Sequence, residues 1–156
     1  MPLVVMVVGI VGIVPVIVCG LGAIGPSTGA ADMLAALIGY CAVVLSFLGG
    51  MQWGFALRPV EAGGHAQPWR LVLGVVPPLA GWVALLVALV LWSWLSLLLL
   101  AAGFIATVVT EYRWAQHGMG VPGGYLWLRW GLTAVIVAML VTVLTLRLLG
   151  VTVVVV

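Results

Sequence analysis

The chain has 156 residues, of which 66% are apolar and 5% are charged, and its mean hydropathy is +1.43. A water-soluble domain of this length needs far more polar surface, so the composition excludes that class and predicts a protein solvated by lipid. The net charge of +2 arises from few ionisable groups that form no run along the chain. We therefore expect neither nucleic-acid binding nor a polybasic lipid-binding segment.

Long apolar segments dominate the chain, and roughly 20 such residues cross the ~30 Å hydrocarbon core of a bilayer as a helix. The run 71–112 is about twice as long as one crossing needs, so it is expected to fold back near Trp92, Ser93 and Trp94. The prediction is an all-α polytopic membrane protein, with residues 1–156 forming one bundle of five transmembrane helices. The predicted spans are 3–24, 34–57, 71–91, 95–112 and 126–146.

The arginines predict the orientation of the bundle. Five crossings place four of them on the side of the amino terminus and leave Arg147 alone on the other side; the four are Arg58, Arg70, Arg113 and Arg129. The positive-inside rule then predicts a cytoplasmic amino terminus. Cleavage of the first segment as a signal peptide, near residues 28–30, is the alternative; it is disfavoured because the apolar run is long and no basic residue precedes it.

Small residues in the second predicted span indicate a helix contact. Gly49, Gly50 and Gly54 let a neighbouring backbone approach closely. Gln52 is the most polar side chain well inside any span, so it is expected to face protein and to find a hydrogen-bond partner there. Binding of a ligand by Gln52 is the less common alternative.

The first and third predicted spans share a short pattern, Gly12-Ile13-Val14-Pro15 and Gly74-Val75-Val76-Pro77. Each proline removes a backbone donor, so both helices are expected to kink. The pattern is typical of a duplicated helical hairpin, although a match of only four residues in a chain rich in Gly, Val and Pro is better explained by chance.

Three motifs resemble a known family. The segment Leu45-Ser46-Phe47-Leu48-Gly49-Gly50 with Trp53-Gly54, the segment Gly74-Val75-Val76-Pro77, and the positions Tyr125, Leu128, Arg129, Leu132 and Thr133 are similar to a domain-of-unknown-function membrane family that includes transmembrane protein 69. Trp127 stands where that family has a basic residue. The resemblance implies a small multi-pass membrane protein and no established activity.

No pattern of residues predicts catalysis, and no catalytic, cofactor-binding or metal-ligating residue is expected. Both histidines, His65 and His117, fall in predicted loops, and Cys19 and Cys41 lie in separate spans, where they are expected to act as small apolar residues. A disulfide between them requires that the first two helices touch at matching depth.

The polar residues near the cytoplasmic boundary allow two interpretations. Glu111 and Arg113 end the fourth span and Arg129 opens the fifth, so they could meet across the loop with Arg58. The first interpretation is that they are topology signals and interfacial anchors. The second is a cytoplasmic docking face for a partner, or an anion site.

Three functions remain open. The first is an accessory, structural or assembly subunit of a larger membrane complex, because loops are short and buried polar groups are few. The second is a small oligomeric transporter or channel, disfavoured because no ionisable residue lies deep in a span. The third is a membrane enzyme, which requires Glu111, His117 and Arg129 to converge. The expected location is the inner membrane of a bacterial cell, or the mitochondrial inner membrane in a eukaryote, in contact with lipid and other membrane subunits.

Overall fold

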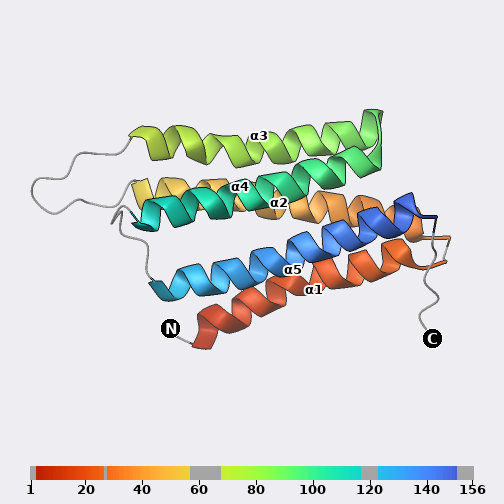
Figure 1. Cartoon of the computed structure of the whole chain (residues 1–156), viewed down its shortest axis with the longest axis horizontal. Helices are drawn as coiled ribbons and strands as arrows, with labels where there is room; N and C mark the ends of the chain where they lie inside the picture. Colours follow the sequence, from red (N-terminus) through yellow and green to blue (C-terminus); the bar gives the residue numbers. More distant parts are fainter. Residues whose placement is uncertain (1–2, 27, 57–67, 117–122, 151–156) are drawn as a thin grey trace, which may run out of the picture.

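The computed structural model describes residues 3–26, 28–56, 68–116 and 123–150, and within these ranges the chain forms helices and no strand. The helices run alternately in opposite directions along a single bundle (Figure 1). The predicted all-α class is therefore confirmed. The helices of the described residues are α1 (Leu3–Ile24), α2 (Ala30–Ala56), α3 (Pro68–Val90), α4 (Ser93–Gln116) and α5 (Gly123–Leu148).

Four of these helices are long and apolar enough to cross a membrane: Ala30–Gly54, Leu71–Val90, Ser93–Gln116 and Leu126–Leu148. The apolar stretch Gly9–Ile24 of α1 is shorter than a typical crossing. The helices have the character of membrane-inserted segments, and the fifth crossing and the orientation stay predictions.

The predicted hairpin in the long apolar run is confirmed. The helix α3 ends at Val90 and α4 begins at Ser93, and the Trp92 carbonyl accepts hydrogen bonds from the Leu95 and Ser96 amides at 3.2 and 3.4 Å. The indoles of Trp92 and Trp94 stack with centroids 6.1 Å apart. Two antiparallel helices therefore replace one helix that would be too long for a bilayer.

The helix α2 begins earlier than predicted, at Ala30 rather than residue 34. Its first turn contains Asp32, and a carboxylate is favourable there because the amino-terminal end of a helix carries partial positive charge. The helix therefore extends about one turn before the predicted span, through Asp32.

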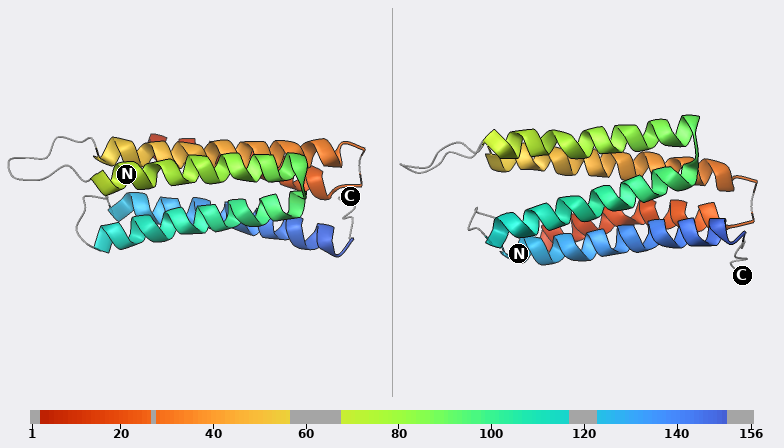
Figure 2. Two further views of the ribbon diagram at one scale, coloured as in Figure 1. Left: turned by 90° about the horizontal axis from the view of Figure 1, so that it is seen from above. Right: turned by 45° about the horizontal axis from the view of Figure 1, so that its top comes forward.

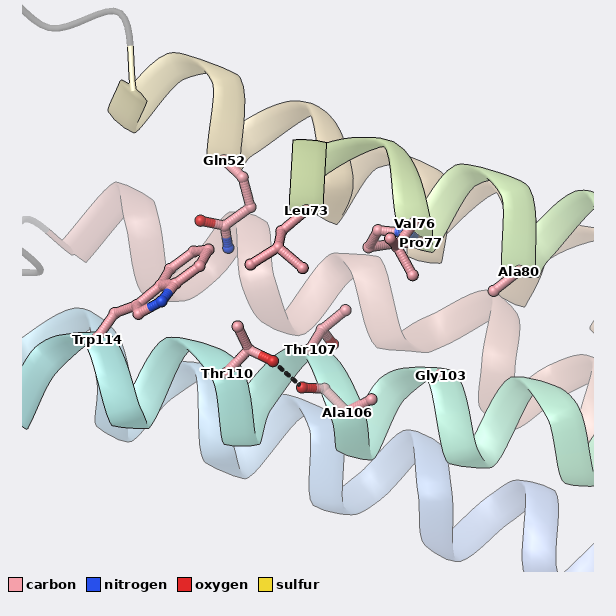
Figure 3. A pocket seen from close by; sticks show the side chains of 10 residues that line it. All are labelled: Gln52, Leu73, Val76, Pro77, Ala80, Gly103, Ala106, Thr107, Thr110 and Trp114. Atoms are coloured by element: carbon pink, nitrogen blue, oxygen red, sulfur yellow. Dashed lines mark hydrogen bonds between the residues drawn. The ribbon is translucent and has the colours of Figure 1, made fainter. Parts of the chain in front are cut away.

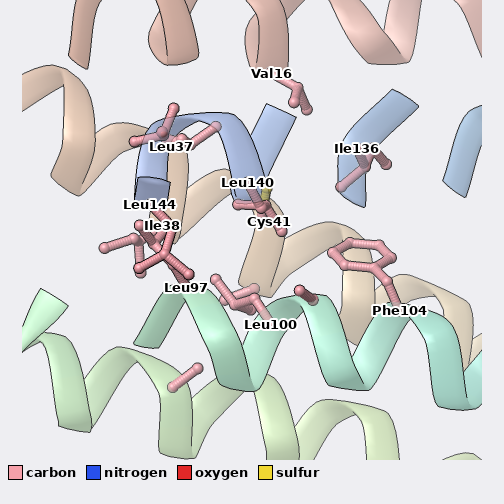
Figure 4. Close-up of a cluster of buried hydrophobic side chains, with 14 of the residues drawn as sticks. Val16, Leu37, Ile38, Cys41, Leu97, Leu100, Phe104, Ile136, Leu140 and Leu144 are labelled. Carbon is pink, nitrogen blue, oxygen red and sulfur yellow. The ribbon is translucent and has the colours of Figure 1, made fainter. Parts of the chain in front are cut away.

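The helices α2 and α4 form the centre of the bundle, since α2 contacts α1, α3 and α4, and α4 contacts α2, α3 and α5. The helix α5 packs against α1 and α4, while α3 packs only against α2 and α4 and lies at the edge of the bundle (Figure 2). Lipid is as apolar as the helix surfaces, so the hydrophobic effect does not favour helix association inside a membrane. Close contact among buried side chains supplies dispersion energy instead. Figure 4 shows this core, whose largest fully buried side chains are Phe104, Leu37, Leu45, Leu97, Leu100 and Leu140.

The helices α2 and α3 approach each other at glycine. A Cβ added to Gly49 would collide with the Gly74 carbonyl oxygen and the Pro78 ring, and one added to Gly81 would lie 2.8 Å from the Ala42 carbonyl oxygen. The two contacts are seven residues apart on each helix, which is two helical turns. The predicted close approach at Gly49 is therefore confirmed, and its partner is α3.

The same prediction was wrong for Gly50 and Gly54. No atom lies within 4 Å of a Cβ built on either residue, and both are exposed. Gly50 is one residue from Gly49, and successive residues of a helix are turned by 100°, so only one of the two can face α3.

The prolines explain the contact with Gly74. The helix α3 runs on through Pro77 and Pro78, and Pro78 has no N–H to donate to the Gly74 carbonyl four residues earlier. Gly49, which has no Cβ, leaves room for that oxygen against α2. The indole of Trp53 donates to the Leu71 carbonyl at 3.0 Å one turn away.

Candidate functional site

A buried polar cluster, formed by Gln52, Thr107, Glu111 and Arg129, joins three helices. Gln52 of α2 donates from Nε2 to Oε1 of Glu111 on α4 at 2.8 Å, and Arg129 of α5 donates from Nε to Oε2 of the same carboxylate at 3.0 Å. Thr107 accepts a longer bond of 3.5 Å from Nη2 of Arg129. Both oxygens of the carboxylate are therefore bonded, one to each neighbouring helix.

The cluster is removed from solvent. Glu111 is 2% exposed, and Gln52 and Arg129 are each 6% exposed. A charge in such a place is costly unless it is paired and hydrogen-bonded, and here the pair has no net charge. The ion pair and its amide donor thus hold α2, α4 and α5 at fixed depths relative to one another.

The depth of the cluster follows from chain position. Gln52 lies four residues before the end of α2, Glu111 five before the end of α4, and Arg129 six after the start of α5. At 1.5 Å per residue each lies roughly 6–9 Å inside the same end of the bundle. The exposed rings of Tyr112 and Trp130 meet edge to face beside the ion pair, with centroids 5.9 Å apart.

A cavity of about 90 Å³ lies next to the cluster, between α3 and α4 and with Gln52 of α2 at its inner wall (Figure 3). Its lining is mainly apolar and includes Pro77 and Gly103, with Thr107 and Thr110 on α4. The Thr110 hydroxyl donates to the Ala106 carbonyl at 2.7 Å. The volume suits a few water molecules, since one needs about 10–15 Å³.

The polar residues predicted from sequence fall into three groups. Gln52 faces protein and has a hydrogen-bond partner, as predicted, and Glu111 pairs with Arg129, one of the contacts that the sequence allowed. Arg113 is exposed, whereas Arg58 and His117 lie outside the described residues. Glu111 and Arg129 are buried inside the bundle, so these two residues do not contribute to the docking face that was the second interpretation of the polar residues.

The partner of Gln52 was missed, although the signal was available. Gln52, Glu111 and Arg129 lie at similar distances from the same end of the bundle. Side chains at the same depth on adjacent helices can contact one another. The expectation that buried polar groups are few was also wrong, since the core contains an ion pair, an amide and the two hydroxyls of Ser96 and Thr133, for which the described residues provide no partner.

The cluster is suited to a structural role more than to chemistry. Both carboxylate oxygens are occupied, and within the described ranges no three residues of the types His, Cys, Asp and Glu are grouped so that they could hold a metal ion. Cys19 and Cys41 are free thiols, and Cys41 is buried in the core among leucines. A network of this kind fixes register among helices.

Antiparallel helices with membrane-like composition, held by a buried ion pair and glycine contacts, define a multi-helix membrane protein. The chain belongs to the family described as protein of unknown function, DUF3429, whose model matches residues 1–145. No curated protein matches the chain. No solved structure matches it either.

Proposed function

We propose that this chain is a small multi-pass membrane protein that acts as an accessory, structural or assembly subunit of a larger membrane complex. The observation that supports the proposal is Trp82 on α3, whose side chain is 58% exposed. It lies eight residues before Val90, so about 12 Å from the nearer end of the helix. Tryptophan in membrane proteins usually lies at the water interface, where its N–H is solvated.

The environment of Trp82 favours a protein partner over lipid. No described residue accepts a hydrogen bond from its indole N–H, and hydrocarbon supplies no acceptor. The next residue, Gly81, packs against α2, and no helix of the described residues covers the outer side of α3. Large exposed apolar side chains continue along that side, including Val75, Leu79 and Leu86. A second protein packed on this side of α3 would cover the apolar side chains and could supply a backbone or side-chain acceptor for the indole N–H of Trp82.

Substitution of Trp82 tests the proposal. Native membranes are solubilised gently, the tagged chain is isolated, and the particle mass and stoichiometric companions are recorded. A constant companion is expected with the native chain, and Trp82→Ala should lose it while the isolated variant keeps its helical content. The matched control is Trp127→Ala, because Trp127 is also exposed but lies near the end of α5. A lone monomer from native membranes would refute the subunit proposal.

The proposed topology has five crossings, a cytoplasmic amino terminus and an inner-membrane location in a bacterium. It places Arg58, Arg70, Arg113 and Arg129 in the cytoplasm and Arg147 outside. A phosphatase reporter fused after Val156 should be active only in the periplasm. Activity of a cytoplasmic reporter at the same position would contradict a topology with five crossings and a cytoplasmic amino terminus.

A small oligomeric transporter is the second candidate, favoured by the cavity beside Gln52. Two ionisable residues, Glu111 and Arg129, are also buried between the helices, as the charged groups of transporters are. Flux of a solute into liposomes that contain the purified chain alone would favour this candidate over the subunit.

A further inference from the structure

The opposite end of the bundle contains the largest cavity described here, about 310 Å³, which we call the terminal cup. The first turns of α2 and α4, the Leu91–Trp92 turn and the last turn of α5 form it. Its volume exceeds that of the cavity beside Gln52 more than threefold. It is at the lower end of the size range of sites for small organic ligands.

The lining of the terminal cup combines three kinds of side chain. Leu34, Leu97 and Leu144 supply apolar surface. The stacked and exposed indoles of Trp92 and Trp94 form one wall. Arg147 is the cationic group. Tryptophan and arginine are common where a membrane helix bundle meets the lipid headgroups. This end of the bundle is therefore expected to lie at the headgroup level.

The guanidinium of Arg147 is held in place but is not neutralised. Its Nε donates to the Ala23 carbonyl in the last turn of α1 at 3.4 Å, where a cation is favourable because carbonyl groups at a helix end lack donors. No described carboxylate forms an ion pair with it, and neither terminal nitrogen has a partner among the described residues. Two N–H-bearing nitrogens therefore remain available for an anion with oxygen atoms, such as a phosphate.

We propose that the terminal cup binds the phosphate and glycerol end of an anionic phospholipid. Arg147 pairs with the phosphate, and the leucines contact the upper acyl chains. A bare phosphate leaves most of the apolar lining uncovered, so the amphiphile fits the cup better than a soluble anion. The proposal requires membrane insertion and is independent of the subunit role.

Lipid retention measures the proposed binding. The purified full chain is loaded with dioleoyl phosphatidylglycerol or dioleoyl phosphatidylcholine in micelles, and retained lipids are counted by native mass spectrometry. We expect preferential retention of phosphatidylglycerol. Arg147→Gln should lower that preference about fivefold, which is the factor expected for one arginine at an anionic membrane surface. The matched control is Arg113→Gln, because Arg113 is exposed near the opposite end of the bundle.

Two further experiments distinguish a lipid site from a site for phosphate alone and provide a second variant. Soluble glycerol 3-phosphate at millimolar concentration should not displace the lipid; if it does, the site recognises phosphate alone and the proposal of a lipid site is wrong. Trp92→Ala leaves the bond between Arg147 and α1 intact but removes part of the cup wall, so it should reduce retention of phosphatidylglycerol, and the test stands even if Arg147→Gln fails to fold. Equal retention by the native chain, Arg147→Gln and Trp92→Ala would overturn the proposal.

Discussion

Replacement of Glu111 with Leu is expected to destabilise the bundle by about 3–5 kcal/mol, the cost of leaving one partner of a buried ion pair alone. Arg129 would keep its charge, since a guanidinium stays protonated in proteins. Arg129 is 6% exposed in the native fold, and the Thr107 hydroxyl at 3.5 Å is its other described acceptor. The free energy of unfolding, measured by titrating mixed micelles with dodecyl sulfate and following circular dichroism, gives the loss.

The double substitution Glu111→Leu with Arg129→Leu separates loss of charge pairing from loss of packing. Apolar residues of similar volume often replace a buried pair at little cost, so the double variant should recover most of the stability. Arg113→Gln is the control, because this exposed residue belongs to the same helix as Glu111, and its effect should stay within about 0.5 kcal/mol. If Glu111→Leu alone were as mild as the control, the pair would not stabilise the fold.

Gly49→Ala should cost about 1–3 kcal/mol, the range for overpacking a close contact. The added methyl would collide with the backbone oxygen of Gly74 and with the ring of Pro78, and neither is a flexible side chain that can move away. The helices α2 and α3 would have to separate, which also weakens the bond from Trp53 to the Leu71 carbonyl. The same unfolding titration measures the effect.

The neighbouring glycine is the matched control. Gly50→Ala adds the same methyl one residue later, where no atom lies within 4 Å, so it should be neutral or stabilising by up to about 1 kcal/mol through helix propensity. Equal destabilisation by the two substitutions would mean that the packing of α2 differs from that described.

The glycine contacts between α2 and α3 and the buried polar cluster bring together the three motifs of the family resemblance, which are far apart in the chain. Gly49 and Trp53 belong to the first motif and contact the second at Gly74 and one turn before it, at Leu71. Arg129 belongs to the third and reaches α2 through Glu111 and Gln52. The motifs therefore make up one connected set of contacts around α2.

Composition and the spacing of arginines were sufficient to predict the class, the helices and the hairpin at Trp92, because lipid requires each segment to satisfy its own backbone. They also placed Gln52, Glu111 and Arg129 near one end. Which face of each helix turns inward was decided only by tertiary structure: the spans are apolar on all sides, so no polar stripe distinguishes Gly49 from Gly50. The bond from Gln52 to Glu111 joins residues 59 positions apart, and only the packing of α2 against α4 brings them together.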